Sequence, residues 1–272
     1  MGQRVILGVA AVAVVAAAAA AMVEMRKRSA ATEADTAATP AASADIDPDA
    51  IGTLTRMGAY LRSLTAFQVR ASTSHENVLE SGQKVQFDRT VDILAQRHPD
   101  RLREDVTSDK QHRLLLYNGK LFTMWADRSN YYTTVPAPPT IGELVDTLEN
   151  KFGIETVLGD LFLWGTPRSQ TSTITSALDI GPSTVDGTTC EQYAFRQPGL
   201  DWQLWVQQGN YPLPRKLVIT TLTDDARPQY EATLTWNLAP SYNDAAFTFD
   251  PPPDAHKITL AQIRDSTVKV KQ

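Results

Sequence analysis

The sequence contains a single cysteine, Cys190, among its 272 residues. One thiol cannot close an internal disulfide, and it cannot supply a cysteine-based zinc cluster or a paired redox motif. The neighbouring Glu191 opposes the lowered thiol pKa that a nucleophilic cysteine needs. Cys190 is therefore predicted to be a small, half-buried residue of a strand, and it lies too far along the chain to be the lipidated first residue of a lipoprotein.

Histidines and catalytic motifs are also scarce. The four histidines, His75, His98, His112 and His256, lie in separate segments, and none belongs to a pair with metal-ligand spacing. The chain has no Gly-x-Ser-x-Gly elbow, no phosphate-binding loop and no dinucleotide-binding fingerprint. The adjacent carboxylates of Asp224-Asp225 lie in a turn-like string, where such side chains point apart into solvent. The sequence thus predicts no catalytic residue, no metal site, no cofactor and no enzymatic activity.

An excess of positive charge is absent as well. The chain has 26 Lys and Arg against 31 Asp and Glu, a net charge of −5. A mildly acidic protein is poorly suited to nucleic acid or to general adhesion on anionic lipid, since both attract basic surfaces. No nucleic-acid partner is expected.

The N-terminus carries an export signal. Arg4 precedes residues 5–23, an uncharged run rich in alanine and valine, and this order is typical of a secretory signal. The weak hydrophobicity of alanine favours a cleaved signal peptide. The basic cluster Arg26-Lys27-Arg28 favours a retained membrane anchor instead, because basic flanks tend to stay cytoplasmic. Either form places the body of the chain outside the cytoplasm, and we expect a periplasmic protein with a cleaved signal.

Composition divides the chain into four parts. Residues 1–23 form the signal peptide or anchor, and residues 24–46, rich in Ala, Thr, Ser and Asp, are predicted to be a disordered linker with little to bury. Residues 47–262 have a globular composition and enough length for one core. Residues 263–272 are predicted to be a C-terminal tail.

Within the globular part, apolar spacing predicts helices at residues 48–63, 140–152 and 157–164. Asp47 is placed to cap the first helix, and Thr140 begins a capping box in the second. The third stretch is so apolar that a helix cannot turn all of its large side chains to one face.

Elsewhere apolar and polar residues alternate with period two, as in strands. One example places Phe87, Arg89, Val91 and Ile93 on the same face, and Asn118-Gly119 is a strong hairpin signal. We count roughly nine to eleven strands with short turns, which predicts a mainly β fold with a few helices, built on one large antiparallel sheet. A sheet of this size curls, so the helices are expected to cover its concave face.

A set of short strings resembles a family of predicted periplasmic proteins of unknown function (domain of unknown function 2092) within the LolA/LolB-like lipoprotein-carrier superfamily. In the first half these strings are Asp47-Pro48, Tyr60-Leu61, Phe67, Gly82-Gln83-Lys84, Arg97-His98-Pro99-Asp100-Arg101-Leu102 and Tyr117-Asn118-Gly119-Lys120. In the second half they are Leu213-Pro214-Arg215-Lys216, Trp236, Phe247, Phe249 and Pro252-Pro253-Asp254-Ala255.

The resemblance covers residues 47–260. It implies a LolA-like unclosed β half-barrel, with helices over a hydrophobic cavity, and relatives that carry lipid or sense misfolded envelope proteins. The chain departs from LolB-type proteins because it has no cysteine placed for lipidation. No single basic residue can be matched to the functional one of the carriers.

Nine apolar residues are candidates to line such a cavity or its lid. They are Phe67, Phe87, Leu144, Leu148, Leu161, Phe162, Trp164, Trp202 and Trp236. Core filling and cavity lining use the same residue types, so both interpretations stay open at this point. The charged string 97–101 is similarly open, because it can be an Asp–Arg-braced turn or a grip for a lipid head group.

The predicted function is a periplasmic carrier or chaperone, a monomer whose partner is a lipid or an acylated protein. Release of the ligand would require the helices to swing aside at residues 136–139 and 165–167. The alternative is an envelope sensor or interaction module that uses the same groove, with an envelope membrane protein as its partner. A less favoured alternative, an envelope hydrolase, predicts a convergent Asp/Glu/His cluster inside the cavity.

Overall fold

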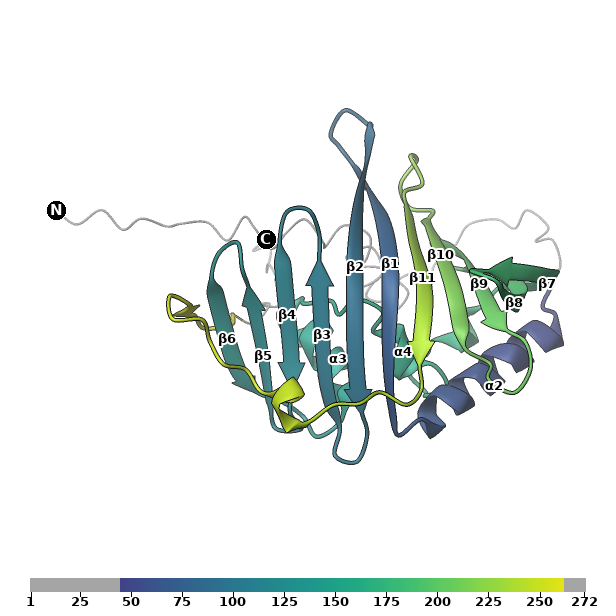
Figure 1. Ribbon diagram of the computed structural model, residues 1–272. Helices are drawn as coiled ribbons and strands as arrows, with labels where there is room; N and C mark the ends of the chain where they lie inside the picture. The colour runs from purple at the N-terminus through teal and green to yellow at the C-terminus, as the bar shows by residue number, and fades with distance from the viewer. Residues whose placement is uncertain (1–44, 262–272) are drawn as a thin grey trace, which may run out of the picture.

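The computed structural model describes residues 45–261, which form one twelve-stranded sheet covered by helices (Figure 1). The strands are β1 (Ala66–Val78), β2 (Lys84–Gln96), β3 (Arg101–Thr107), β4 (His112–Tyr117), β5 (Leu121–Ala126), β6 (Tyr131–Pro136), β7 (Ser176–Val185), β8 (Thr188–Gln197), β9 (Leu200–Gln207), β10 (Pro214–Thr221), β11 (Gln229–Asn237) and β12 (His256–Lys257). The predicted signal segment, the linker up to residue 44 and the tail from residue 263 lie outside the described residues.

The sheet is unclosed. Its order is β12-β6-β5-β4-β3-β2-β1-β11-β10-β9-β8-β7, so the two halves of the chain meet where β1 pairs with β11. Neighbouring strands are antiparallel except the short β12, which runs parallel to β6. The predicted fold class, mainly β with helices over one face of a half-barrel, is confirmed.

Strand β7 is the main element that the sequence did not predict. It lies at one edge of the sheet, and its register shifts between Asp179 and Gly181. Gly181 has φ of 110°, and Pro182 cannot donate to a ladder, so both residues interrupt the alternation that identifies a strand. An edge position tolerates these residues because one side of the strand has few partners to satisfy.

The helical layer begins with α2 (Pro48–Ser63), where the Asp47 carboxylate accepts a hydrogen bond from the Asp49 N–H at 2.8 Å. In α3 (Ile141–Thr147) the Thr140 hydroxyl accepts from the Glu143 N–H at 3.2 Å. Both predicted caps are confirmed. The predicted helix 140–152 ends in a π-helical turn, η1 (Leu148–Phe152), and α4 (Asp160–Leu163) and η2 (Thr171–Thr173) complete the layer. A last short helix, η3 (Asp244–Phe247), packs on the opposite face of the sheet, where the Ala246 carbonyl accepts from the Arg103 guanidinium at 3.4 Å.

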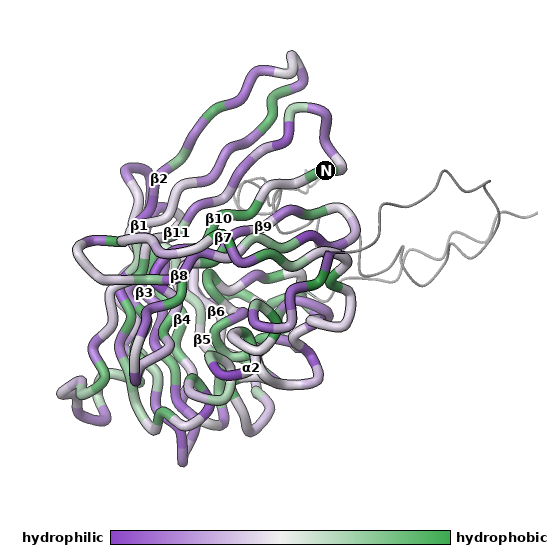
Figure 2. The backbone as a smooth tube through the Cα atoms, turned by 90° about the vertical axis from the view of Figure 1, so that its right-hand side faces the viewer, coloured by the Kyte–Doolittle hydropathy of each residue, from purple (hydrophilic) through white to green (hydrophobic). Residues whose placement is uncertain are grey.

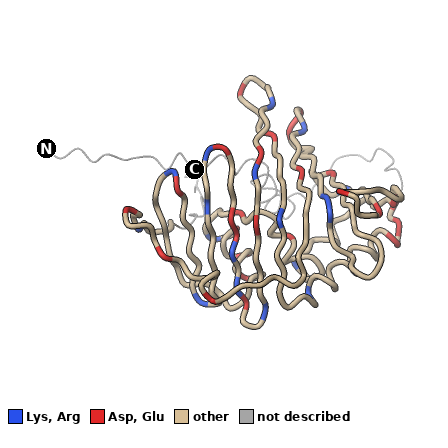
Figure 3. Tube along the Cα trace, viewed as in Figure 1, with Lys and Arg blue, Asp and Glu red and all other residues tan. Residues whose placement is uncertain are grey.

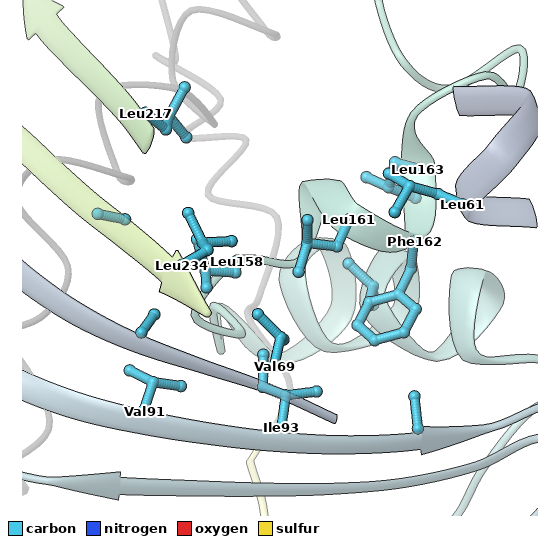
Figure 4. Packing of buried hydrophobic residues seen from close by; sticks show 14 of the residues in the cluster. Leu61, Val69, Val91, Ile93, Leu158, Leu161, Phe162, Leu163, Leu217 and Leu234 are labelled. Carbon is cyan, nitrogen blue, oxygen red and sulfur yellow. The ribbon is translucent and has the colours of Figure 1, made fainter. Parts of the chain in front are cut away.

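The predicted helix at residues 157–164 is wrong in its first turn. Only α4 is helical, because Leu158 has φ of 58° and Gly159 follows it. Leu161, Phe162 and Leu163 are all at most 4% exposed, so α4 is buried on several sides. Figure 4 shows their side chains above Val69 and Ile93 of the sheet.

The core fills the space between the concave face of the sheet and the helices. On β1, Phe67, Val69 and Ala71 point inward and are at most 2% exposed. The inward rows continue across β2 and β3, where Ile93 pairs with Glu104. Among residues 45–261, no helix has the length and apolar character needed to cross a membrane.

The β1–β2 hairpin extends beyond its neighbours in the sheet (Figures 1 and 2). Figure 2 shows hydrophilic and hydrophobic stretches along its outer part, and Figure 3 shows charged residues near its tip. Lys84 and Glu76 form an ion pair there, with 3.0 Å between Nζ and Oε2. The β1–β2 pairing continues to Val78 and Lys84 at the end of the hairpin.

Close packing of α2 on the segment after α4 leads to a stability prediction. A Cβ added at Gly58 would lie 2.7 Å from the backbone N and Cα of Gly165, so Gly58→Ala should force the two segments apart. We expect a loss of about 1–3 kcal/mol in the free energy of unfolding, measured by urea denaturation. Gly52→Ala in the same helix is the control, because its Cβ would meet only the Arg56 guanidinium at 3.1 Å. Equal losses in both variants would contradict this account.

Candidate ligand cavity between the sheet and the helices

A cavity of about 140 Å³ lies between the sheet and the segment around α4. Its sheet wall comes from β1, β2, β10 and β11, and its other wall comes from α3, η1, α4 and the connection before α4. The apolar part of the lining includes Val145, Leu161, Leu163, Leu217 and Ile219. A cavity of this size accepts a molecule about as large as benzene.

A second hollow, which we call the groove, adjoins this cavity. The groove has a volume of about 350 Å³ and is lined by the segment after α4 and by β9 and β10. Four residues line both spaces: Asp160, Trp164, Leu217 and Ile219. The two spaces therefore adjoin at these side chains, and their combined volume reaches the size range of small-molecule binding sites.

One end of the cavity is polar. The Arg89 guanidinium lies 3.2 Å from His75 Nε2, measured from Nη2. Arginine only donates, so the imidazole accepts through Nε2 and is neutral. Burial lowers the pKa of His75 to about 4, and the positive charge of Arg89 adds to this effect. Tyr230 completes this part of the lining, and its burial raises the pKa of its hydroxyl, which stays protonated.

A fully buried carboxyl group lies behind the cavity wall. Glu104 of β3 is 1% exposed, and its Oε1 accepts a hydrogen bond from the Val157 N–H at 3.2 Å. Burial raises the pKa of Glu104 to about 7, although the nearby charge of Arg113 and the Val157 hydrogen bond both favour the ionised form. Glu104 therefore ties the sheet to the connection that enters α4.

The hydrolase alternative predicts Asp, Glu and His side chains inside the cavity, and His75, Glu149, Glu155 and Asp160 all line it. His75 itself is not placed as a general base. The one lone pair of neutral His75 that could accept a proton already accepts a hydrogen bond from Arg89. The Cys190 thiol is completely buried, with a pKa raised by that burial, so it is no activated nucleophile. Within residues 45–261 no group of three or more His, Cys, Asp or Glu side chains is placed to hold a metal ion.

The predicted ligand-binding residues divide into two groups. Leu161 and Trp164 line the cavity, and Trp164 and Trp202 line the groove. The Trp202 indole N–H is buried without a hydrogen-bond partner in the described part of the chain. These three residues remain candidates for ligand contact.

Five of the other predicted residues lie in the core or at its margin. Phe67 packs against Phe162 and Trp236, with ring centroids 5.9 and 5.3 Å away. Leu144 and Leu148 are also core residues, whereas Phe87 is half-buried outside the core, with its ring centroid 5.4 Å from that of His75. Leu144 and Leu148 are 1% exposed, and the adjacent Val145 and Glu149 line the cavity in their place.

Sequence analysis missed the polar end of the cavity, but a signal was present. Thr73 and His75 continue the inward face of β1, and Arg89 shares the inward face of β2 with Val91 and Ile93. Polar residues in phase with a buried apolar row mark a site where the core is interrupted. The charged string 97–101, in contrast, is structural at Asp100, whose carboxylate accepts from the Ile141 N–H at 2.9 Å and so holds the start of α3.

The fold and cavity define a class of protein: a mainly β half-barrel, with helices enclosing an apolar space on the concave face. Residues 50–261 match the family described as "Predicted periplasmic protein (DUF2092)", and the chain belongs to this family. This membership confirms the resemblance and the periplasmic location predicted from sequence. No curated protein matches the chain in sequence.

Several solved structures are similar to this chain. Lipoprotein LppX from Mycobacterium tuberculosis has a TM-score of 0.46 and 14% identity, covering 72% of this chain and 100% of its own. LprF from Mycobacterium bovis has a TM-score of 0.43 and 15% identity, over 73% and 97% of the two chains. A LolA superfamily protein from Nitrosomonas europaea has a TM-score of 0.27 and 10% identity, over 74% and 97%. At these values the similarity does not extend to function.

Proposed function

We propose that the protein binds a lipid, or the acyl chain of a lipoprotein, and carries or shields it in the periplasm. The observation that supports this most directly is that the cavity and the groove adjoin, with Leu217, Ile219 and Trp164 lining both. The cavity alone holds about 140 Å³, too little for a long hydrocarbon chain. A chain that also extends into the groove has enough room.

The energy of binding would come from apolar surface withdrawn from water. Each square ångström of such surface contributes about 25 cal/mol, so one acyl chain can be held without specific polar contacts. Trp164 lies where the two spaces meet and is only partly buried. It is placed to cover the chain, and movement of α4 would release the ligand.

Blocking the shared region tests the proposal. Ile219→Trp adds a large ring where the cavity and groove meet, so it should weaken binding of a fluorescent fatty acid by about tenfold or more. Thr220→Trp is the matched control, because the next residue of the same strand points to the opposite face of the sheet. Fluorescence titration of the purified domain measures both affinities.

The two variants have distinct expected results. Thr220→Trp should bind the probe as the unchanged protein does, while Ile219→Trp should not. Probe binding that is equally strong in Ile219→Trp would place the ligand elsewhere, and absence of binding by the unchanged protein would remove the proposal.

A second candidate function, a sensor that pairs with an extended peptide, has one observation in its favour. Strand β7 lies at the edge of the sheet, with Leu178 and Ile180 exposed by 38% and 53%. Against it, Ala177 is already bridged to Ile46, and Pro182 removes a donor further along. The edge open to a peptide is therefore short, and we favour lipid binding.

A further inference from the structure

The sheet wall of the cavity carries a positive charge that forms no ion pair with the described residues, 45–261. Arg89 lines the cavity, and no ion pair found within residues 45–261 includes it. Its neighbour His75 is neutral, so the contact between them compensates no charge. A partly buried guanidinium is normally matched by a carboxylate or phosphate, because burial without one is unfavourable.

A second guanidinium strengthens this charge. Arg113 of β4 is close enough to Arg89 for each charge to disfavour the other. The Nε and Nη2 atoms of Arg113 are buried without a hydrogen-bond partner in the described part of the chain. Glu104 is the acidic neighbour of Arg113, and its own pKa is raised to about 7. The carboxyl group that could balance the pair is thus only partly ionised near neutral pH.

Carboxylates also line the cavity, on the opposite wall. They are Glu149 of η1, Glu155 of the connection between η1 and α4, and Asp160 of α4. Each of them already has a polar or electrostatic interaction of its own. The charge in the cavity that lacks a partner is therefore positive and belongs to the sheet wall, although these acids would repel an anion placed against the helical wall.

We propose that Arg89, with Arg113 beside it, binds the anionic head group of the ligand, a carboxylate or a phosphate, while the hydrocarbon tail extends past Leu161 and Leu217 toward the groove. This inference rests on the proposed function and specifies the ligand class as a negatively charged amphiphile. The guanidinium geometry suits both anions, since its donors pair with two oxygens at once.

Three amphiphiles with one chain length test the head-group preference: hexadecanoic acid, hexadecanol and hexadecylamine. Each is titrated against the fluorescent probe at neutral pH, where the Glu104 carboxyl group is only partly ionised, with the unchanged protein, Arg89→Met and Arg89→Lys. The acid should bind about tenfold or more tightly than the alcohol, and the amine more weakly than both. Arg89→Met should remove the advantage of the acid over the alcohol, and Arg89→Lys should keep most of that advantage.

The control is Arg70→Met, on the opposite face of the same sheet, where Arg70 pairs with Asp92 at 2.9 Å. This variant should keep the preference for the acid. Inorganic phosphate at millimolar concentration should displace none of the three amphiphiles, which distinguishes a lipid head group from a free anion as the ligand. Displacement by phosphate would overturn the lipid assignment.

Equal binding of acid and alcohol by the unchanged protein, or preference for the amine, would overturn this inference and leave the proposed function standing. Binding of none of the three would instead remove the proposed function.

Discussion

Replacing Glu104 with glutamine should stabilise the protein above pH 7 and change little below pH 4.5. The carboxyl group is fully buried, and this burial raises its pKa from 4.5 to about 7. The folded protein therefore binds this proton more readily than the unfolded chain does between these two pH values. Its stability falls as the pH rises through this window, by about 3 kcal/mol for a shift of this size. Glu104→Gln removes this loss, and its amide oxygen can still accept from the Val157 N–H.

The measurement is urea unfolding of both proteins across this pH range. The contribution of His75 to stability depends on pH in the opposite sense. Its pKa is lowered from 6.5 to about 4, so its contribution to the free energy of unfolding falls as the pH drops through this range. The difference between variant and unchanged protein cancels the His75 contribution. Glu80→Gln is the control, because it makes the same substitution at the exposed tip of the β1–β2 hairpin. A difference that does not grow between pH 4.5 and 7 would contradict the buried state of Glu104.

Replacing Phe162 with alanine should lower the free energy of unfolding by about 3–5 kcal/mol. The ring is 4% exposed, and its centroid lies 5.9 Å from that of Phe67. It joins α4 to the sheet on the side away from the cavity, so its loss leaves a void that the surrounding backbone cannot fill. Circular dichroism during urea unfolding measures the change, with the slope of the transition checked for two-state behaviour.

Phe152→Ala is the matched control for this substitution. Phe152 ends η1 and is only partly buried, with Lys151 Nζ 5.3 Å from its ring centroid. Because less of its surface is withdrawn from water, we expect a loss below about 2 kcal/mol. Losses of the same size in both variants would show that Phe162 is not part of the central core.

Local signals in the sequence were sufficient for most of the fold. The Asp47 and Thr140 caps, the Asn118-Gly119 hairpin and the alternation of β1 and β2 all depend on neighbouring residues, and the structure agrees with each of them. Strand β7 was not predicted, because Gly181 and Pro182 interrupt its alternation of apolar and polar residues. Its place at the edge of the sheet is a tertiary property that no local pattern contains.

The cavity was harder to predict, for a physical reason. Whether an inward side chain fills the core or lines a void depends on the distance between the sheet and the helices. Phe67 lies where α4 packs onto the sheet, and Leu217 lies where the layers separate, yet both belong to regular apolar rows. The sequence placed Arg89 on the inward face correctly. It could not show that Arg113, from β4, would come close to it.

The central claim is that the space between the sheet and the helices holds a lipid. Native mass spectrometry of protein purified from periplasm without detergent, followed by solvent extraction, tests it most directly. We predict a stoichiometric excess of mass that extracts as a lipid with an acidic head group. A mass equal to that of the polypeptide alone, in protein that also takes up no fluorescent fatty acid, would contradict the claim.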